Sequence, residues 1–182
     1  MRKYDKFMIE TAQALSSLST CKRGQVGAIV SKGGRILVTG YNGTISGQDN
    51  NCEYKYVECG RCKKHLEIAD EVLAVVTDIT IVCSDCRADN DYKNVNKHIK
   101  LKTNDLTLHA EQNAIAYAAK LGIPLDDTTM YVSMSPCKQC AKLIAQSGVT
   151  RVVYANEYRD TTGIEFLKFV GVEVNKYESK EK

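Results

Sequence analysis

The residues of this chain that could perform chemistry lie in two short motifs. The first is His109-Ala110-Glu111, and the second is Pro136-Cys137-Lys138-Gln139-Cys140. One imidazole and two thiolates are donors that suit Zn²⁺, and three protein ligands leave the fourth tetrahedral position open to water. Glu111 follows the first ligand closely, so its carboxylate can carry protons without binding the metal. The pattern predicts a catalytic zinc ion held by His109, Cys137 and Cys140, with Glu111 as the catalytic proton shuttle.

Both motifs fall where helices are expected to begin. Ser135 is a predicted N-cap and Pro136 suits the first helical position. The three-residue spacing of Cys137 and Cys140 then places both sulfurs on one helical face. A helix N-terminus also favours thiolate over thiol. The alternative is a zinc ion kept only for structure, beside which Glu111 is simply an acidic residue in a first turn.

The expected elements around these motifs alternate between strands and helices. Apolar residues at spacings of three and four predict a first helix over 4–18. Two strands joined by Gly33-Gly34 read as a hairpin. The order β-β-α-β-α-β-α-β after the first helix predicts an α/β fold, a three-layer α/β/α sandwich with a central mixed five-stranded sheet. The segments that give this order are 25–30, 35–41, 110–121, 130–133, 136–147, 151–155, 162–170 and 172–174.

A cysteine-rich segment interrupts this order. We expect a single domain over 1–182, with residues 53–106 as an insertion within it. The insertion carries a C-x₂-C-x₂₀-C-x₂-C pattern, which has the spacing of a structural Cys₄ zinc site. A saturated site of this kind orders a polar segment but activates no water. The four predicted ligands are Cys59, Cys62, Cys83 and Cys86.

Composition narrows the classes of partner. The 182 residues carry a net charge of only +3, which gives no electrostatic footprint for a long nucleic acid but is compatible with a small phosphorylated substrate. No stretch has the length of apolar sequence that a membrane span needs. The first residues lack the apolar core of a signal peptide, and tight C-x-x-C pairs favour metal over disulfides. We therefore expect a cytoplasmic protein with no membrane partner.

The motifs also resemble those of a known family. Gly40-Tyr41-Asn42-Gly43, the stretch 108–115 and the stretch 130–140 are similar to the zinc-dependent cytidine/deoxycytidylate deaminase family. Within it, the chain resembles the dCMP deaminases of bacterial late-competence and phage type. The resemblance covers about residues 4–53 and 106–175, and the insertion matches only loosely.

This resemblance implies zinc-dependent hydrolysis of dCMP to dUMP and ammonia, a reaction that feeds dTTP synthesis. It implies activation by dCTP with Mg²⁺, inhibition by dTTP, and a homo-oligomer, with a hexamer favoured. It assigns substrate contacts to Asn42 at the sugar, to Ala110 and Ser135 at the base, and to Tyr154 near the phosphate. It also offers Cys21 and Cys52, with partners from the insertion, as alternative ligands of the structural zinc.

Four other functions remain open at this point. A free cytidine or riboflavin-pathway pyrimidine deaminase would differ in how the substrate phosphate and sugar are recognised. A deaminase of another cytosine nucleotide such as dCTP would use the same zinc chemistry. A tRNA adenosine deaminase shares the two motifs, but the modest charge and the Gly-Tyr-Asn-Gly loop argue against it. A non-catalytic zinc-ribbon module would bind nucleic acid through the insertion, using the lysines Lys93, Lys97, Lys100 and Lys102.

Overall fold

The computed structural model describes residues 2–58, 63, 65–67 and 100–178. The chain divides into two compact units. One combines Met1–Asn50 with Leu106–Lys182, and the other is Asn51–Asp105. The prediction of a single domain with an insertion over 53–106 stays a prediction.

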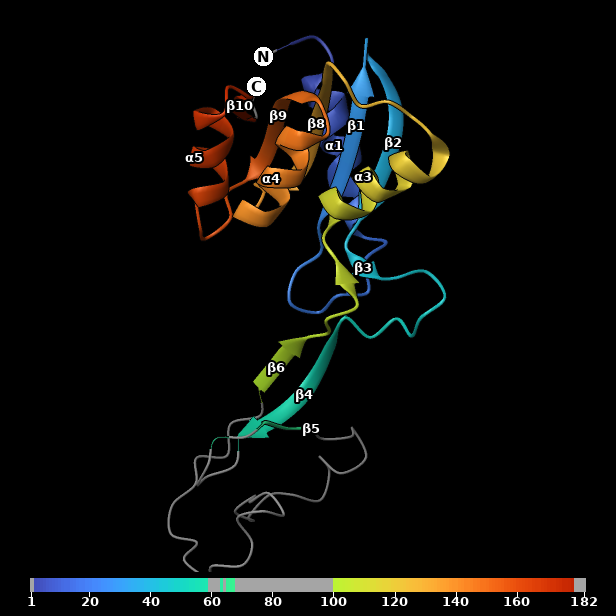
Figure 1. Ribbon diagram of the computed structural model, residues 1–182, viewed down its shortest axis with the longest axis vertical. Helices are drawn as coiled ribbons and strands as arrows, with labels where there is room; N and C mark the ends of the chain where they lie inside the picture. Colours follow the sequence, from blue (N-terminus) through green and yellow to red (C-terminus); the bar gives the residue numbers. More distant parts are fainter. Residues whose placement is uncertain (1, 59–62, 64, 68–99, 179–182) are drawn as a thin grey trace, which may run out of the picture. The chain divides into compact units, whose positions relative to one another are not determined.

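The first unit is built on a mixed sheet of five strands (Figure 1). Its order is β10-β9-β8-β1-β2. Strand β1 is antiparallel to both β2 and β8, whereas β8, β9 and β10 are mutually parallel. The strands are β1 (Gly27–Lys32), β2 (Arg35–Tyr41), β8 (Thr128–Met134), β9 (Val149–Asn156) and β10 (Glu173–Lys176).

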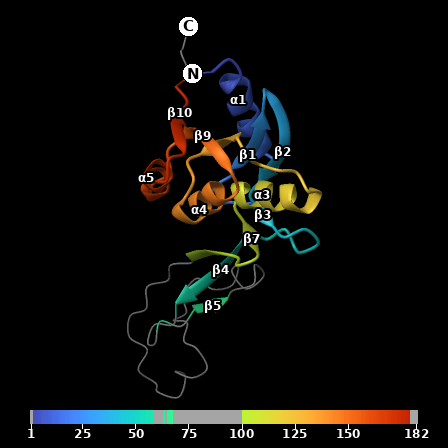
Figure 2. The ribbon, with the colours of Figure 1, turned by 45° about the horizontal axis from the view of Figure 1, so that its top comes forward.

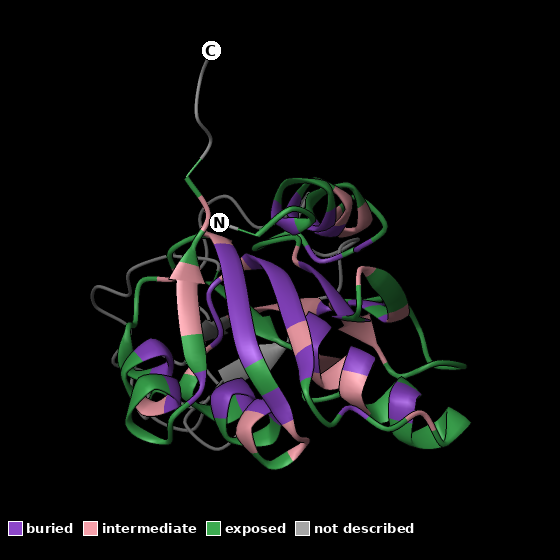
Figure 3. Ribbon diagram, turned by 90° about the horizontal axis from the view of Figure 1, so that it is seen from above, coloured by how far each residue is buried: buried purple, intermediate pink, exposed green. Residues whose placement is uncertain are grey.

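Helices cover both faces of this sheet (Figure 3). Helix α1 (Asp5–Ser16) packs on one face, where Met8, Ile9 and Ala12 meet Ile29 of β1. The helices α3 (Ala110–Leu121), α4 (Lys138–Gln146) and α5 (Thr162–Phe169) cover the other face, over a larger core. This arrangement confirms the predicted α/β/α sandwich. In the described part of the chain, no helix is long and apolar enough to cross a membrane.

Small residues let the helices approach the sheet closely. A Cβ atom at Gly40 of β2 would collide with the backbone oxygen of Ala110 and lie 2.7 Å from the nitrogen of Ala114. Both alanines are fully buried on the face of α3 that meets the sheet. The start of α3 is therefore fixed against β2 by direct backbone packing.

A short two-stranded ladder leads into α3 (Figure 2). Strand β3 (Gly43–Thr44) pairs antiparallel with β7 (Thr107–Leu108), with Gly43 opposite Leu108. The chain passes directly from β7 to His109. The loop after Asn42 and the first metal-ligand motif therefore lie side by side, although they are far apart in sequence.

The described part of the second unit is a three-stranded antiparallel sheet with order β5-β4-β6. Its strands are β4 (Glu53–Glu58), β5 (His65–Glu67) and β6 (Lys100–Thr103). Lys100 forms an ion pair with Glu58 across β6 and β4, with 2.7 Å between Nζ and Oε1. Lys102 lies over the Tyr54 ring. Lys100 and Lys102, two of the four lysines that the zinc-ribbon alternative assigns to nucleic-acid binding, therefore make contacts within this sheet.

Candidate metal centre

The two sequence motifs meet at one point in the first unit. The ligand atoms of His109, Cys137 and Cys140 all lie within 4.8 Å of one another. His109 Nδ1 is 3.4 Å from the Cys140 sulfur and 3.7 Å from the Cys137 sulfur. Nδ1 is therefore the imidazole nitrogen directed at the thiols. Exposure decreases from His109 to Cys137 to Cys140, the last of which is fully buried.

The start of α3 holds the imidazole in place. His109 is the N-cap residue of this helix, and its backbone nitrogen donates to Oε1 of Gln112 at 2.8 Å. The side chain of Asn113 donates to the backbone oxygen of Tyr41 at 2.9 Å and ties the helix to the end of β2. The sequence analysis did not single out Gln112 and Asn113. Their signal is the spacing from the N-cap residue, which matches a capping arrangement.

The start of α4 holds the two sulfurs. Cys137 is the N-cap of this helix, and Cys140 lies in its first turn. The predicted N-cap at Ser135 is wrong, because the Ser135 hydroxyl accepts a hydrogen bond from the backbone nitrogen of Tyr158 at 2.8 Å instead. The Ser135 nitrogen also donates to the oxygen of Asn156 at 2.8 Å. Ser135 thus joins the loops that follow β8 and β9, two residues before Cys137.

Gly163 supports the cysteine motif from α5 and was missed from the sequence. A Cβ atom there would collide with the backbone oxygen of Pro136 and lie 2.8 Å from the carbonyl carbon of Cys137. Only glycine permits this approach of α5 to the start of α4. The sequence around Gly163 contains no local pattern that predicts this contact with the distant Pro136 and Cys137.

Glu111 lies beside the ligands in a buried position. It belongs to the first turn of α3 and is 4% exposed. Burial raises the pKa of its carboxyl above the ordinary value. A carboxyl with a raised pKa both accepts and releases a proton more readily near neutral pH than an exposed glutamate does. The position of Glu111 therefore suits proton transfer.

The donor set fits Zn²⁺. Hydrogen bonds, first from the Cys140 thiol and then from His109, lower the pKa of Cys137 to about 3, so a thiolate already forms at this site. The imidazole faces both sulfurs through Nδ1, and a carboxylate stands next to them. Two cysteines and one histidine form a ligand set found in catalytic zinc sites.

The structure also places the four residues that the resemblance assigned to substrate. Ala110, Ser135 and Tyr154 are buried, and Tyr154 belongs to the core on the α3–α5 side of the sheet. Asn42 is half-buried, and its side chain accepts from the Val26 nitrogen and donates to the Gly24 oxygen, each at 2.8 Å. Asn42 therefore orders the loop before β1, a role that the sequence analysis did not foresee.

The second zinc ion stays a prediction. Its four predicted ligands, Cys59, Cys62, Cys83 and Cys86, lie outside the described residues. The alternative ligands Cys21 and Cys52 are both buried. The described residues therefore test neither ligand set.

Comparison with known proteins agrees with this geometry. The family model described as the cytidine and deoxycytidylate deaminase zinc-binding region matches residues 1–156. The deoxycytidylate deaminase of Enterobacteria phage T4 is 36% identical over 177 residues, which cover 92% of this chain and 86% of that protein. The ComE operon protein 2 of Bacillus subtilis is 30% identical over 98% of this chain and 73% of that protein.

A solved structure is similar over nearly the whole chain. It is the dCMP deaminase of the cyanophage S-TIM5 in complex with dCMP and dUMP. The two chains are 35% identical with a TM-score of 0.68, and the match covers 97% of this chain and 99% of that one.

Proposed function

Because the chain belongs to the cytidine and deoxycytidylate deaminase zinc-binding family, we propose that it hydrolyses dCMP to dUMP and ammonia. The observation that carries this proposal is the convergence of His109, Cys137 and Cys140 beside the buried carboxyl of Glu111. The similarity to dCMP deaminases over almost the full chain supports dCMP as the substrate.

His109, Cys137 and Cys140 would hold the catalytic zinc ion. Zinc bound there supplies a Lewis acid that lowers the pKa of water towards ~7. Glu111 accepts the proton that the water loses and delivers it to the ring N3 of cytosine as the oxygen adds at C4. Glu111 then takes the second proton from the new C4 hydroxyl and passes it to the amino group, which leaves as ammonia while C4 keeps the oxygen as a carbonyl. The products are dUMP and ammonia, so one water molecule is consumed for each dCMP.

The remaining site residues position the nucleotide. Ala110, the first residue of α3, would line the base next to Glu111. Ser135 directly follows β8, and Tyr154 lies two residues before the end of β9, near the carboxyl ends of the parallel strands, where α/β folds bind ligands. Asn42 would contact the sugar from the loop after β2. Its amide retains unused hydrogen-bonding capacity, because each polar atom can make a second bond.

Regulation and assembly extend the proposal. We propose that dCTP with Mg²⁺ activates the enzyme, that dTTP inhibits it, and that it acts in the cytoplasm as a homo-oligomer. Large apolar side chains are exposed on α3 and α4, at Tyr117, Leu121 and Leu143, and give a surface for self-association. Light scattering measures the mass of the assembly.

The substrate assignment is tested by ammonia release from four compounds. Zinc-replete protein is incubated with dCMP, dCTP, deoxycytidine and CMP under identical conditions. We expect the highest kcat/KM for dCMP, because deoxycytidine lacks the phosphate, CMP carries an additional 2′-hydroxyl, and dCTP brings two further phosphates that a monophosphate site would not accommodate. Repeating the dCMP assay with dCTP and with dTTP checks the two effectors. A preference for dCTP as substrate would keep the zinc chemistry but overturn the assignment of dCMP.

A further inference from the structure

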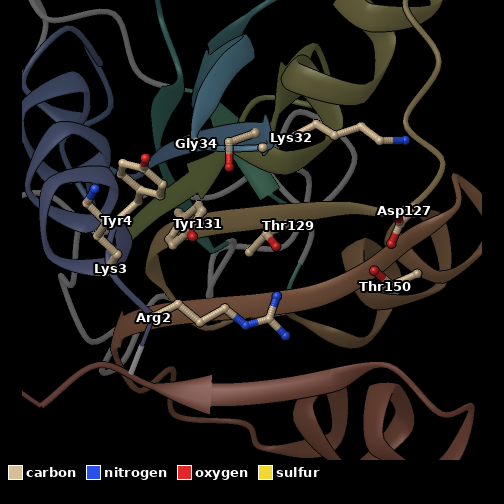
Figure 4. Close-up of a pocket in the computed structure, with 11 residues that line it drawn as sticks. Arg2, Lys3, Tyr4, Lys32, Gly34, Asp127, Thr129, Tyr131 and Thr150 are labelled. Carbon is tan, nitrogen blue, oxygen red and sulfur yellow. The ribbon is translucent and has the colours of Figure 1, made fainter.

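A cavity of about 590 Å³ opens in the first unit, away from the metal centre (Figure 4). Three segments line it: the residues that precede α1, the β1–β2 turn, and the starts of β8 and β9. Strand β8 connects the two places, since Thr129 lines the cavity and Cys137 follows the other end of the strand. At ~3.3 Å per residue, the five steps from Thr129 to Met134 separate the two ends of β8 by about 17 Å. The volume is within the range of small-molecule sites, roughly 300–1,000 Å³.

The charged side chains of the lining are mostly cationic. Arg2, Lys3 and Lys32 contribute positive charge, and Asp127 contributes the one carboxylate among the lining residues. The ammonium group of Lys32 donates to the backbone oxygen of Asp126 at 2.7 Å, a neutral acceptor that leaves its charge uncompensated. The ammonium group of Lys3 lies 5.4 Å from the centre of the Tyr4 ring. These contacts hold both cations at the cavity without neutralising them.

Arg2 has an acidic partner that a ligand can displace. Its guanidinium is 2.7 Å from Glu173, and both side chains are well exposed, at 62% and 48%. Exposed ion pairs contribute little to stability, about 0–1 kcal/mol. A doubly charged phosphate offers Arg2 a stronger, bidentate acceptor than this carboxylate does.

Polar groups and a fixed backbone complete the cavity. Figure 4 shows Thr129 between Arg2 and Lys32 in this view and Thr150 beside Asp127, so hydroxyl groups accompany the charged side chains. The rim is built from left-handed backbone at Gly33, Gly34 and Asp127, with φ values of 57°, 77° and 55°. Gly34 cannot accept a side chain, because a Cβ atom there would overlap the Tyr4 ring. The half-exposed Tyr4 ring therefore packs directly against Gly34, where both residues line the cavity.

We propose that this cavity binds a small phosphorylated ligand at a site distinct from the metal centre. Arg2, Lys3 and Lys32 donate hydrogen bonds to the phosphate oxygens, and the Thr129 hydroxyl donates a further one. The Asp127 carboxylate accepts from a hydroxyl group of the ligand. A concave cavity with a few cations suits a small molecule, whereas a long polyanion requires an extended basic stripe.

Calorimetric titration with inorganic phosphate tests this site without relying on deamination. The wild-type protein is compared with Lys32→Met and Arg2→Met, which remove charge while keeping most of the apolar stem. We expect each substitution to weaken phosphate binding by about 10-fold or more, because a charge-assisted hydrogen bond is lost. Lys32→Arg is expected to retain binding. Lys168→Ala on α5, an exposed lysine on the other face of the sheet, is the matched control and should leave the affinity unchanged.

Glu173→Gln is expected to strengthen phosphate binding, whereas Lys32→Met and Arg2→Met weaken it. Glu173→Gln removes the carboxylate that competes for Arg2 while keeping an oxygen that can accept from Arg151 Nε, now 3.0 Å away. Phosphate binding should tighten by about 2–5-fold. Thermal unfolding of each variant establishes that it folds. Equal affinity in wild type, Lys32→Met and Arg2→Met would place the phosphate elsewhere and overturn the proposal. Absence of binding to the wild type at 10 mM phosphate would also overturn it, because a dissociation constant of roughly 10 mM is the weakest that such a site would have.

Discussion

Replacing Glu111 with glutamine is expected to leave zinc bound but to slow dCMP turnover by about 10²–10⁴-fold. Glutamine has nearly the same shape but cannot accept a proton from water or release one to the leaving amino group. Glu111 is 4% exposed and lies in the first turn of α3, so the substitution also removes a buried charge without opening a cavity. Turnover is measured as ammonia release and dUMP formation, and zinc content by elemental analysis of the same sample.

Glu10→Gln provides the matched control for this substitution. Glu10 is an exposed glutamate on α1, on the other face of the sheet, and its contact with Lys6 is long at 3.8 Å. The control should keep wild-type turnover and zinc content. If Glu111→Gln retained more than about a tenth of the wild-type kcat, Glu111 would not be the proton shuttle.

Replacing Asp5 with asparagine is expected to lower the free energy of unfolding by about 3 kcal/mol. The Asp5 carboxylate is completely buried and receives both terminal nitrogens of Arg151, at 2.7 and 2.8 Å. It also accepts from the Tyr131 hydroxyl at 2.9 Å and from the Arg2 backbone nitrogen at 2.7 Å. Asparagine keeps one acceptor oxygen but leaves the buried Arg151 guanidinium with only the partly exposed Glu173 carboxylate, 3.0 Å from Nε, as its counter-charge. Urea unfolding at neutral pH measures the loss.

The same carboxylate makes stability depend on pH. Burial alone raises the pKa of Asp5, but the hydrogen bonds from Arg151, Arg2 and Tyr131 outweigh it and lower the pKa from 3.8 to about 2. The folded pKa lies below the unfolded one, so the stabilisation is complete above pH ~4 and is lost as the pH falls through ~2. This difference of nearly two pKa units corresponds to about 2–3 kcal/mol.

The difference in unfolding free energy between wild type and Asp5→Asn should therefore shrink as the pH falls from 5 to 2. Loss of zinc at acid pH affects both proteins alike and cancels from the difference. Glu10→Gln, which alters only an exposed pair, should change stability by less than about 0.5 kcal/mol. A difference that stays constant over this pH range would show that the Asp5 charge does not stabilise the fold.

The architecture of the first unit was predictable because its signals are local. Apolar spacing gave the helix that the structure places at Asp5–Ser16, and Gly33-Gly34 marked the hairpin between β1 and β2. The metal ligands were predictable for the same reason, since donor type and spacing within each motif are short-range properties. Only their meeting in space required the fold.

Contacts between distant segments could not be predicted in this way. Asp5 and Arg151 are 146 positions apart, and nothing near Asp5 distinguishes it from an ordinary first-turn acid. The approach of Gly163 to Pro136 is equally invisible in the local sequence. Ser135 was misread because its residue type and the following proline satisfy the rule for an N-cap, whereas the tertiary bond to Tyr158 takes its hydroxyl.

Zinc dependence of dCMP turnover is the most direct measurement on the catalytic site. The wild-type protein is stripped with a chelator, assayed for ammonia release, reloaded with one equivalent of Zn²⁺ at a time, and assayed again. Turnover should vanish on stripping and return in proportion to zinc bound, and Mg²⁺ should not restore it, because Mg²⁺ does not favour a site with two thiolates. Full dCMP turnover by zinc-free protein would contradict a catalytic metal centre at His109, Cys137 and Cys140.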